Sequence, residues 1–283
     1  MRWREIDPLI EAALGEDMPR GDITSESLVP PDSLSEAVLL AKQDGVLAGI
    51  DVARRVFRKI DPGVRFTKLV EDGSSFRRGD VLAEIRGRSL ALLKGERTAL
   101  NFLQRLSGIA TKTRRFVRAA GRTTKILDTR KTTPTLRLLE KYAVKMGGGH
   151  NHRFSLSDMV LIKDNHLRLV GGIAEAVGRA RAKVGPRRKI EVEVTNPAEA
   201  REAVSAGADM IMLDNMPLGR TGEVVREFRG RVPIEVSGGV RLRQVPRIAA
   251  LGVDFISVGG LTHSYDSVDI SLEFTGEARH GRK

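Results

Sequence analysis

The sequence predicts an α/β protein in which an α+β domain precedes a parallel β/α domain. Three observations favour this class. The second half alternates strand-like and helical runs six times, with strands about 20 to 30 residues apart. The first hundred or so residues instead carry short strand-like runs separated by Asp-Gly and Gly-Asp turn signals. No G-x-G-x-x-G run follows the first strand of the second half, so the usual dinucleotide-binding signature is missing.

The N-terminal region is expected to form a small antiparallel sheet with helices. Residues 1–15 and 51–60 have a helical rhythm. Strand-like runs flank the turn signals Asp44-Gly45, Asp72-Gly73 and Gly79-Asp80. No catalytic group of residues stands out in this region.

A long helical pattern follows over residues 89–120, and we place the boundary between the two domains near Gly108. Its candidate core positions are Leu93, Leu100, Leu103 and Leu106.

The second half is expected to form parallel β/α architecture, wound either as a barrel or as an open sheet. The carboxyl ends of parallel strands and the loops after them line one mouth of such a domain. Each expected strand ends in charged, polar or glycine residues there, which predicts a binding site. The expected strands are 125–128, 159–163, 189–194, 210–214, 232–236 and 255–260. The residues at their ends are Arg130 and Lys131, Lys163, Glu193, Asp214, Ser237 with Gly238 and Gly239, and Gly259 with Gly260.

The cations and carboxylates at these ends each have two interpretations. Arg130, Lys131 and Lys163 could be solvated surface charges, but a cation at the end of a buried strand needs an anionic partner. Glu193 and Asp214 could be structural partners of these lysines, or they could face substrate or metal. In the run 189–194 the period of two puts Glu191 and Glu193 on one face, with Glu193 nearer the mouth.

Glycines suggest where anionic groups bind. The two glycine runs after the last two strands predict a phosphate cradle made of backbone N–H groups. The triple glycine 147–149 lets the backbone approach a bound group, and His152 and Arg153 follow it directly. Arg97 lies on a helix upstream and reads as a surface residue from its pattern alone, while His263 has no clear assignment.

Composition limits the classes of function. The chain has 283 residues and no cysteine, which excludes disulfides, thiolate nucleophiles and thiolate metal sites. The net charge of +12 raises nucleic acid as a partner, but the basic residues alternate with acids and aromatic residues make up only 4%. We therefore expect anionic small molecules as substrates rather than nucleic acid.

Membrane insertion and export are not expected. No run approaches the roughly 20 apolar residues that a membrane span requires. The first 18 residues form an amphipathic pattern broken by acids, without the apolar core of a signal peptide. The expected location is the cytoplasm.

Several fixed cations around one ligand indicate more than one anionic group on it. Two carboxylates among them suggest a metal carried in with a diphosphate, or hydrogen bonds to sugar hydroxyls. Phosphoribosyl transfer fits both demands. Two other classes stay open: a barrel aldolase with Lys163 as Schiff base, and a nucleic-acid-binding protein.

A set of motifs resembles the quinolinate phosphoribosyltransferase family, also called carboxylating nicotinate-nucleotide pyrophosphorylases. The resemblance covers nearly the whole chain, and the motifs in this order are highly specific. They are EDMPRGDIT (16–24), GERTALNFLQRLSGIAT (95–111), DTRKTTP (128–134), KYAVKMGGGHNHR (141–153), LIKDNH (161–166), EVEV (191–194), MLDN (212–215), SGG (237–239) and VGGLTHS (258–264).

The resemblance implies transfer of phosphoribose from phosphoribosyl pyrophosphate to quinolinate, with Mg²⁺, giving nicotinate mononucleotide, CO₂ and pyrophosphate. It implies an N-terminal α/β sandwich (1–108), an incomplete β/α barrel (109–265) and a tail of about 266–283 that packs back on the first domain. It also implies a homodimer, which could assemble further, with Arg97 reaching into the partner's site. A paralogous phosphoribosyltransferase of the same fold, or a nicotinate-using enzyme, is the nearest alternative.

Roles for individual residues also follow from the resemblance. Arg130, His152 and Arg153, with Arg97 of the second subunit, would hold the quinolinate carboxylates, and Thr129 would be a further substrate-binding residue. Lys131 and Lys163 would neutralise pyrophosphate, while Glu193 and Asp214 would face the ribose hydroxyls and Mg²⁺, directly or through substrate or water. The 5′-phosphate would lie on Ser237, Gly238, Gly239, Gly259 and Gly260, near His263.

The chain departs from the family pattern at two positions. The family usually has Gly where this chain has Pro19 and Thr135. Neither change removes a charge, so the geometry of two loops is in question rather than the chemistry.

Overall fold

The computed structural model describes residues 2–278, which fall into two compact units. The first unit contains the chain up to Lys112, the segment Pro134–Gly148 and the chain from Tyr265; the second contains Thr113–Thr133 and Gly149–Ser264. The linear division at residue 108 had grouped 109–112 and 134–148 with the second domain. Of the tail expected at 266–283, residues 279–283 lie outside the described part.

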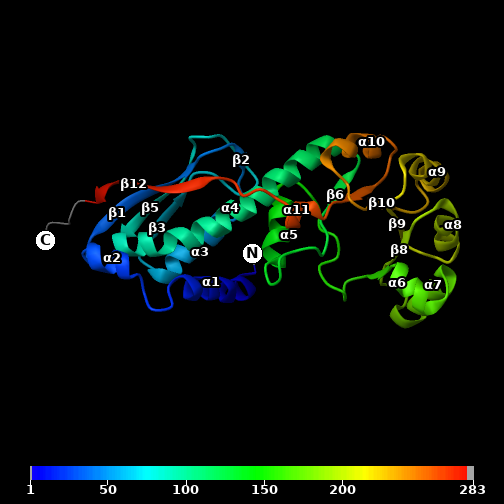
Figure 1. Cartoon of the computed structure of the whole chain (residues 1–283), viewed down its shortest axis with the longest axis horizontal. Helices are drawn as coiled ribbons and strands as arrows, with labels where there is room; N and C mark the ends of the chain where they lie inside the picture. The colour runs from blue at the N-terminus through cyan, green and yellow to red at the C-terminus, as the bar shows by residue number, and fades with distance from the viewer. Residues whose placement is uncertain (1, 279–283) are drawn as a thin grey trace. The chain divides into compact units, whose positions relative to one another are not determined.

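The first unit is built on a four-stranded antiparallel sheet (Figure 1). Strand β1 alternates buried and less buried residues, with Ala37, Leu39 and Ala41 facing the core, as a half-buried strand requires. Strands β2 (Gly45–Val46) and β4 (Ser75–Phe76) form a separate two-stranded ribbon. The order in the larger sheet is β12 (Ile270–Ala278), β1 (Leu34–Ala41), β5 (Val81–Arg88) and β3 (Arg65–Lys68).

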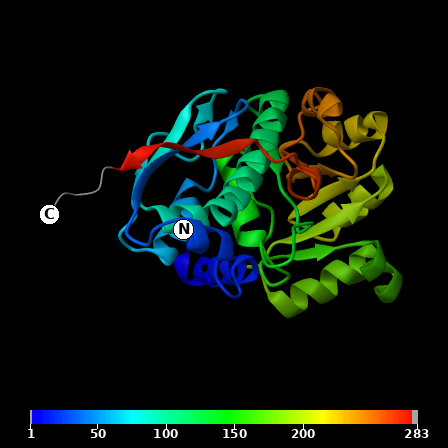
Figure 2. The ribbon, with the colours of Figure 1, turned by 60° about the vertical axis from the view of Figure 1, so that its left-hand side comes forward.

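The sheet of the first unit joins the two ends of the described chain. Strand β12 pairs antiparallel with β1 over its whole length, from Ala41 opposite Ile270 to Leu34 opposite Ala278. Figure 2 shows the two strands side by side. The last strand of the sequence therefore completes the sheet begun by the first.

The described part of the first unit also contains five helices. One of them is the 32-residue helix α4, which continues unbroken past Gly108. Leu100, Leu103 and Leu106 are buried as expected, whereas Leu93 is only half-buried and its neighbour Leu92 takes the core position. The helices are α1 (Trp3–Asp17), α2 (Ile23–Leu28), α3 (Ile50–Ile60), α4 (Ser89–Ala120) and α5 (Arg137–Met146).

The second unit confirms the expected parallel β/α architecture. Its six strands all pair in parallel, in the order β6, β11, β10, β9, β8, β7. In a closed barrel, consecutive strands pair with one another and the last strand pairs with the first. The observed order is that of such a barrel opened between β6 and β7, which do not pair within residues 2–278. The unit is thus an incomplete barrel. The strands are β6 (Lys125–Leu127), β7 (Val160–Ile162), β8 (Ile190–Val194), β9 (Met210–Asp214), β10 (Ile234–Ser237) and β11 (Phe255–Ser257).

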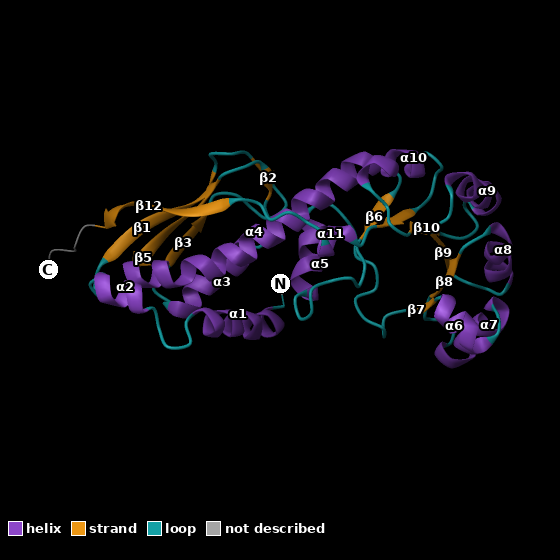
Figure 3. Cartoon of the chain, viewed as in Figure 1, coloured by secondary structure: helices purple, strands orange, loops and turns teal. Residues whose placement is uncertain are grey.

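Helices follow the strands of the second unit and cover the outer face of its sheet. Figure 3 shows α7, α8 and α9 side by side along that face. The short hydrophobic strands are buried on both faces, as parallel strands are. The helices are α6 (Asp164–Val170), α7 (Ile173–Val184), α8 (Pro197–Ser205), α9 (Leu218–Phe228), α10 (Val245–Ala249) and α11 (Gly260–His263), with a 3₁₀ turn η1 (Leu242–Gln244). Among the helices of residues 2–278, none has both the length and the apolar character needed to span a membrane.

At one of the two positions where the chain departs from the family pattern, backbone geometry shows why glycine would suit the position. Thr135 has φ of 68°, a left-handed conformation that glycine adopts freely and a β-branched residue adopts only with strain. Glycine at this position would carry no such strain. Pro19 has no positive φ; the left-handed residue of its turn is Gly21, with φ of 90°. The geometry shows no comparable strain at Pro19.

Gly108 marks a close approach inside the first unit. A Cβ atom added to it would lie 2.3 Å from the backbone oxygen of Asp266, so the α4 helix needs glycine here. We expect Gly108→Ala to lower the free energy of unfolding by about 1 to 3 kcal/mol. The control is Gly15→Ala in α1, which has open space around it and should gain up to about 1 kcal/mol from helix propensity. Thermal unfolding of both variants tests this, and a stabilised Gly108→Ala would contradict it.

Candidate active site

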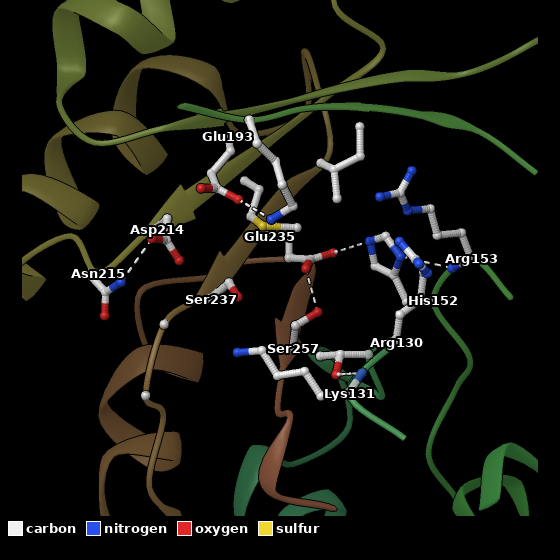
Figure 4. A pocket seen from close by; sticks show the side chains of 16 residues that line it. Arg130, Lys131, His152, Arg153, Glu193, Asp214, Asn215, Glu235, Ser237 and Ser257 are labelled. Carbon is white, nitrogen blue, oxygen red and sulfur yellow. Dashed lines mark hydrogen bonds and ion pairs between the residues drawn. The ribbon is translucent and has the colours of Figure 1, made fainter. Parts of the chain in front are cut away.

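The polar strand ends of the second unit line one cavity of about 530 Å³ (Figure 4). Every strand of the six-stranded sheet, or the loop after it, contributes at least one residue. The lining residues are Thr129, Arg130, Lys131, His152, Arg153, Leu161, Lys163, Glu193, Met212, Asp214, Asn215, Glu235, Ser237, Gly238, Gly239 and Ser257. The structure therefore brings together eleven of the fifteen residues that the sequence analysis selected.

Four selected residues do not line the cavity. Gly259 lies just behind it, because a Cβ atom there would be 3.1 Å from the Lys131 side chain and 3.2 Å from the ring of His263. Gly260 begins the short helix α11, which also contains His263. Arg97 belongs to the first unit, where its side chain is 59% exposed and lies beside Glu96.

The cationic side of the cavity comes from the loop after β6 and the segment before β7. Arg130 and Lys131 are exposed, whereas Arg153 is only partly accessible. Arg153 donates from Nη1 to the carbonyl oxygen of Met159 (3.2 Å), and its buried Nε has no hydrogen-bond partner in the part of the chain that the structure describes. Burial, together with the charge of Arg130, lowers the pKa of Arg153. A buried guanidinium N–H without an acceptor is a ready donor for an anionic ligand.

The acidic side comes from the ends of β8 and β9. Lys163, directly after β7, pairs with Glu193 at 2.5 Å, so the two charges meet at the cavity wall. At the end of β9, the amide of Asn215 donates to Asp214 (2.8 Å). Carboxylate oxygens on two neighbouring strands suit a hard cation that arrives with a diphosphate. Because Glu193 already pairs with Lys163, such an ion would be held largely through its substrate.

The glycine turn after β10 depends on Asn215. Gly238 and Gly239 both have positive φ, 96° and 57°. A Cβ atom on Gly238 would lie 2.4 Å from the Asn215 side chain, so only glycine fits there. Asn215 is itself left-handed, with φ of 51°, and its N–H donates to the carbonyl oxygen of Ser237 (3.0 Å). The two turns are in close contact at the cavity wall, and a turn of left-handed glycines can bind an anion through its backbone N–H groups.

Sequence reasoning did not select two buried acids beside His152, of which Glu235 lines the cavity. Glu191 in β8 and Glu235 in β10 are fully buried, and both approach the ring of His152, at 3.0 and 3.5 Å from Nε2. Ser257 in β11 donates to Glu235. Burial and the charge of Glu191 raise the pKa of Glu235 well above its ordinary range. The signal was present: each glutamate stands between an isoleucine and a valine of its strand.

Two family models account for this set of residues. One, described as quinolinate phosphoribosyl transferase, C-terminal domain, matches residues 109–273. The other, described as the N-terminal domain, matches residues 22–107. The chain belongs to the quinolinate phosphoribosyltransferase family. The resemblance inferred from the motifs is thereby confirmed.

Relatives in this family match over nearly the whole chain. The probable nicotinate-nucleotide pyrophosphorylase (carboxylating) of Bacillus subtilis (strain 168) is 44% identical over 276 residues, which are 97% of this chain and 95% of that protein. Quinolinate phosphoribosyltransferase (decarboxylating) 1b of Nicotiana tabacum is 39% identical, over 96% of this chain and 83% of that protein.

Solved structures confirm the fold of both domains. The crystal structure of NadC from Streptococcus pyogenes superposes with a TM-score of 0.94 at 43% identity, covering 98% of this chain and 99% of that one. The nicotinate-nucleotide pyrophosphorylase from Francisella tularensis gives 0.93 at 40% identity, with 97% of each chain covered. The α/β fold of this chain, with its parallel six-stranded sheet, is thus shared by these structures.

The raised pKa of Glu235 predicts a pH dependence of stability. Above its ordinary value of about 4.5, the unfolded chain loses the proton while the folded chain keeps it, so the free energy of unfolding falls as pH rises. Glutamine cannot titrate. The melting temperature of Glu235→Gln, relative to the unsubstituted protein, should therefore increase from about pH 5 to pH 8.

Glu273 offers a control of opposite sign. Its pKa is lowered by the hydrogen bond from Lys42. The stabilisation that its charged form gives to the folded chain is therefore lost only in acid, below this pH range. Glu273→Gln should shift the melting temperature equally across the range. A melting-temperature difference between Glu235→Gln and the unsubstituted protein that stays constant with pH would contradict a shifted pKa at that residue.

Proposed function

We propose that this protein transfers the phosphoribosyl group of phosphoribosyl pyrophosphate to the nitrogen of quinolinate and then releases CO₂, giving nicotinate mononucleotide and pyrophosphate. One observation carries the proposal. A single cavity presents fixed cations on one side, two carboxylates on the other and a glycine turn between them. A pyridine diacid and a sugar diphosphate together require that set of groups.

The cationic side binds quinolinate. Its two neighbouring carboxylates need two separate donors, which Arg130 and Arg153 supply. The buried Nε of Arg153, which has no acceptor among residues 2–278, gains one when the diacid binds. A monocarboxylate such as nicotinate would leave one of the two guanidinium groups unpaired, which favours the diacid.

The opposite side binds the sugar diphosphate. Asp214 and Glu193 accept hydrogen bonds from the ribose hydroxyls, and the turn at Ser237–Gly239 holds the 5′-phosphate through backbone N–H groups. Lys131 and Lys163 neutralise the diphosphate. When Mg²⁺ is bound with this substrate, it stabilises charge on the leaving pyrophosphate. The residues that would hold the ion are Glu193 and Asp214, through substrate or water.

Catalysis depends mainly on positioning and electrostatics. The bond from the anomeric carbon to pyrophosphate breaks, positive charge develops on the sugar, and the pyridine nitrogen forms the new bond. The nitrogen is then cationic. When the adjacent carboxylate leaves as CO₂, the electron pair stays on the ring carbon, next to that cation, and a proton takes its place. The lysines offset the charge of the departing pyrophosphate.

The ion pair at Lys163 argues against the aldolase alternative. A Schiff-base lysine must attack as a neutral amine. Lys163 instead pairs with Glu193, with its Nζ 2.5 Å from a carboxylate oxygen. Borohydride trapping of a carbonyl compound on Lys163 would favour the aldolase.

The cytoplasmic location and the lack of a nucleic-acid partner stay predictions from the sequence.

The direct test is a turnover assay with the purified chain. Quinolinate, phosphoribosyl pyrophosphate and Mg²⁺ should give nicotinate mononucleotide and CO₂ in equal amounts, and a chelator should stop the reaction. Nicotinate in place of quinolinate should give no product. Product from nicotinate but not from quinolinate would replace the proposal by the paralogous function.

Arg153→Ala should weaken quinolinate binding selectively. Loss of one partner of a buried charge pair costs about 2 kcal/mol or more, which is at least about a 30-fold rise in the KM of quinolinate. The KM of phosphoribosyl pyrophosphate should change by less than about threefold. Arg153→Lys keeps the charge but loses the planar guanidinium group. Its KM for quinolinate should therefore lie between that of the unsubstituted protein and that of Arg153→Ala. Equal effects on both substrates would contradict the assignment.

We also infer that the enzyme is a homodimer in which Arg97 completes the partner's site. At quinolinate concentrations at or below the KM of the unsubstituted enzyme, Arg97→Ala and Arg153→Ala chains should each be nearly inactive alone. In a mixed dimer, one site receives both intact arginines, so random mixing should restore about a quarter of the activity of the unsubstituted enzyme. No restoration on mixing would place Arg97 in its own chain's site or outside any site.

A further inference from the structure

We propose that Asn215 is a positioning residue that fixes the spacing between the carboxylate of Asp214 and the glycine turn at Gly238. Asn215 stands in the MLDN motif and lines the cavity, but neither the motifs nor the strand-end pattern predicts a role for it. The inference rests on the proposed function for the identity of the sugar phosphate, and on the contacts of Asn215 for everything else.

The backbone of Asn215 ties the ends of two neighbouring strands together. Asp214 pairs with Ser237 where β9 and β10 end. One residue further on, the Asn215 N–H donates to the carbonyl oxygen of Ser237 (3.0 Å). Asn215 has φ of 51°, in the left-handed region, which asparagine adopts more readily than most residues with a side chain. The chain therefore leaves β9 at Asn215 while it is still bonded to the end of β10.

The side chain of Asn215 contacts Asp214 and Gly238 at the same time. Its Nδ2 donates to Oδ2 of Asp214 (2.8 Å; Figure 4). An ionised carboxylate only accepts hydrogen bonds, so the amide must present its NH₂ group to Asp214, and its oxygen faces away from that residue. A Cβ atom on Gly238 would lie 2.4 Å from both Cγ and Oδ1 of Asn215, and 2.6 Å from its backbone nitrogen. Only a glycine at position 238 lets the amide occupy this place.

The glycine turn adjoins two cavities. Besides the cavity already described, a second one of about 460 Å³ lies against the turn. Four residues line both cavities: Asn215, Ser237, Gly238 and Gly239. A segment with cavities beside it is held by fewer packing contacts than one in a close-packed interior. The contact with Asn215 therefore does much to hold the turn in place.

These contacts determine how the cavity binds a ribose 5-phosphate group. Asn215 uses one oxygen of Asp214, Oδ2, and the other, Oδ1, can accept from a ribose hydroxyl. The phosphate at the other end of the sugar binds the turn at Gly238 and Gly239. Both ends bind together only if the carboxylate and the turn stay at the matching distance, and an error of about 1 Å is enough to weaken such binding severely. Asn215 contacts both partners and so keeps that distance constant.

The kinetic test compares two substitutions at Asn215. Asn215→Gly keeps the left-handed backbone and removes the amide. Asn215→Asp keeps the size and tolerates the left-handed conformation, but places a second carboxylate beside Asp214. We expect both variants to raise the KM of phosphoribosyl pyrophosphate about tenfold and to leave the KM of quinolinate within about threefold. A purely structural role would instead change both KM values together.

Asn196→Ala is the matched control. Asn196 also follows a barrel strand, β8, but it caps helix α8 by accepting from the Glu199 N–H (3.0 Å) and does not line the cavity. Its substitution should lower the melting temperature through the lost cap, without changing either KM by more than about twofold. If it raised the KM of phosphoribosyl pyrophosphate as Asn215→Gly does, the effect would come from lost stability and the inference would be wrong.

Equilibrium binding provides a readout that does not depend on turnover. Calorimetry should show that ribose 5-phosphate binds the unsubstituted chain about tenfold or more tightly than inorganic phosphate, because only the sugar reaches Asp214. Asn215→Gly should reduce this ratio to about threefold or less, whereas Asn196→Ala should keep it. If the turnover assay with quinolinate fails but the ratio falls in Asn215→Gly, the proposed function is wrong and the positioning role of Asn215 remains.

Four results would overturn the inference. One is an unchanged KM of phosphoribosyl pyrophosphate in both Asn215 variants. Another is an equal rise of both KM values in those variants. The third is ribose 5-phosphate that binds the unsubstituted chain no better than inorganic phosphate. The last is an equal loss of affinity for both ligands in Asn215→Gly, because Asn215 would then support the glycine turn alone and not its spacing from Asp214.

Discussion

The site depends on the parallel pairing of the barrel strands. Because β6 through β11 all run in one direction, their carboxyl ends lie at one edge, and residues far apart in the sequence reach one cavity. Register makes this specific: Asp214 in β9 pairs with Ser237 in β10. A slip of one residue would turn both side chains away from the mouth.

Charge is distributed across this cavity in a consistent way. Arginines from the loops around β6 and β7 lie on one side, and carboxylates from β8 and β9 lie on the other. The pair of Lys163 and Glu193 joins the two sides. Such an arrangement suits a reaction in which an anionic diphosphate leaves and a cationic pyridine nitrogen forms, because each developing charge meets an opposite one already in place. Glu191 and Glu235 add two more carboxyl groups on this side of the sheet, and both are buried away from solvent.

The sequence predicted the strands and their polar ends well, since short apolar runs that stop in Lys, Asp or Ser carry a strong local signal. It did not predict that helix α5 belongs to the first unit, because that grouping depends on tertiary contacts rather than on local pattern. The return of the tail to the first domain was expected from the family resemblance, and β12 pairs there with β1. The buried acids were missed for a related reason. Period-two alternation puts Glu191 on the same face as Glu193, but only the curvature of the sheet shows how deeply it is buried.

The pairing of β1 with β12 has a consequence for biosynthesis. During translation, the residues of the barrel unit leave the ribosome before β12, so the barrel can form while the first sheet still lacks its edge strand. Until the codons for Ile270–Ala278 are read, the outer edge of β1 has no strand to cover it. A nascent chain released early would expose that edge to other chains, and a stop codon shortly before Ile270 would therefore promote aggregation rather than yield a slightly shorter enzyme.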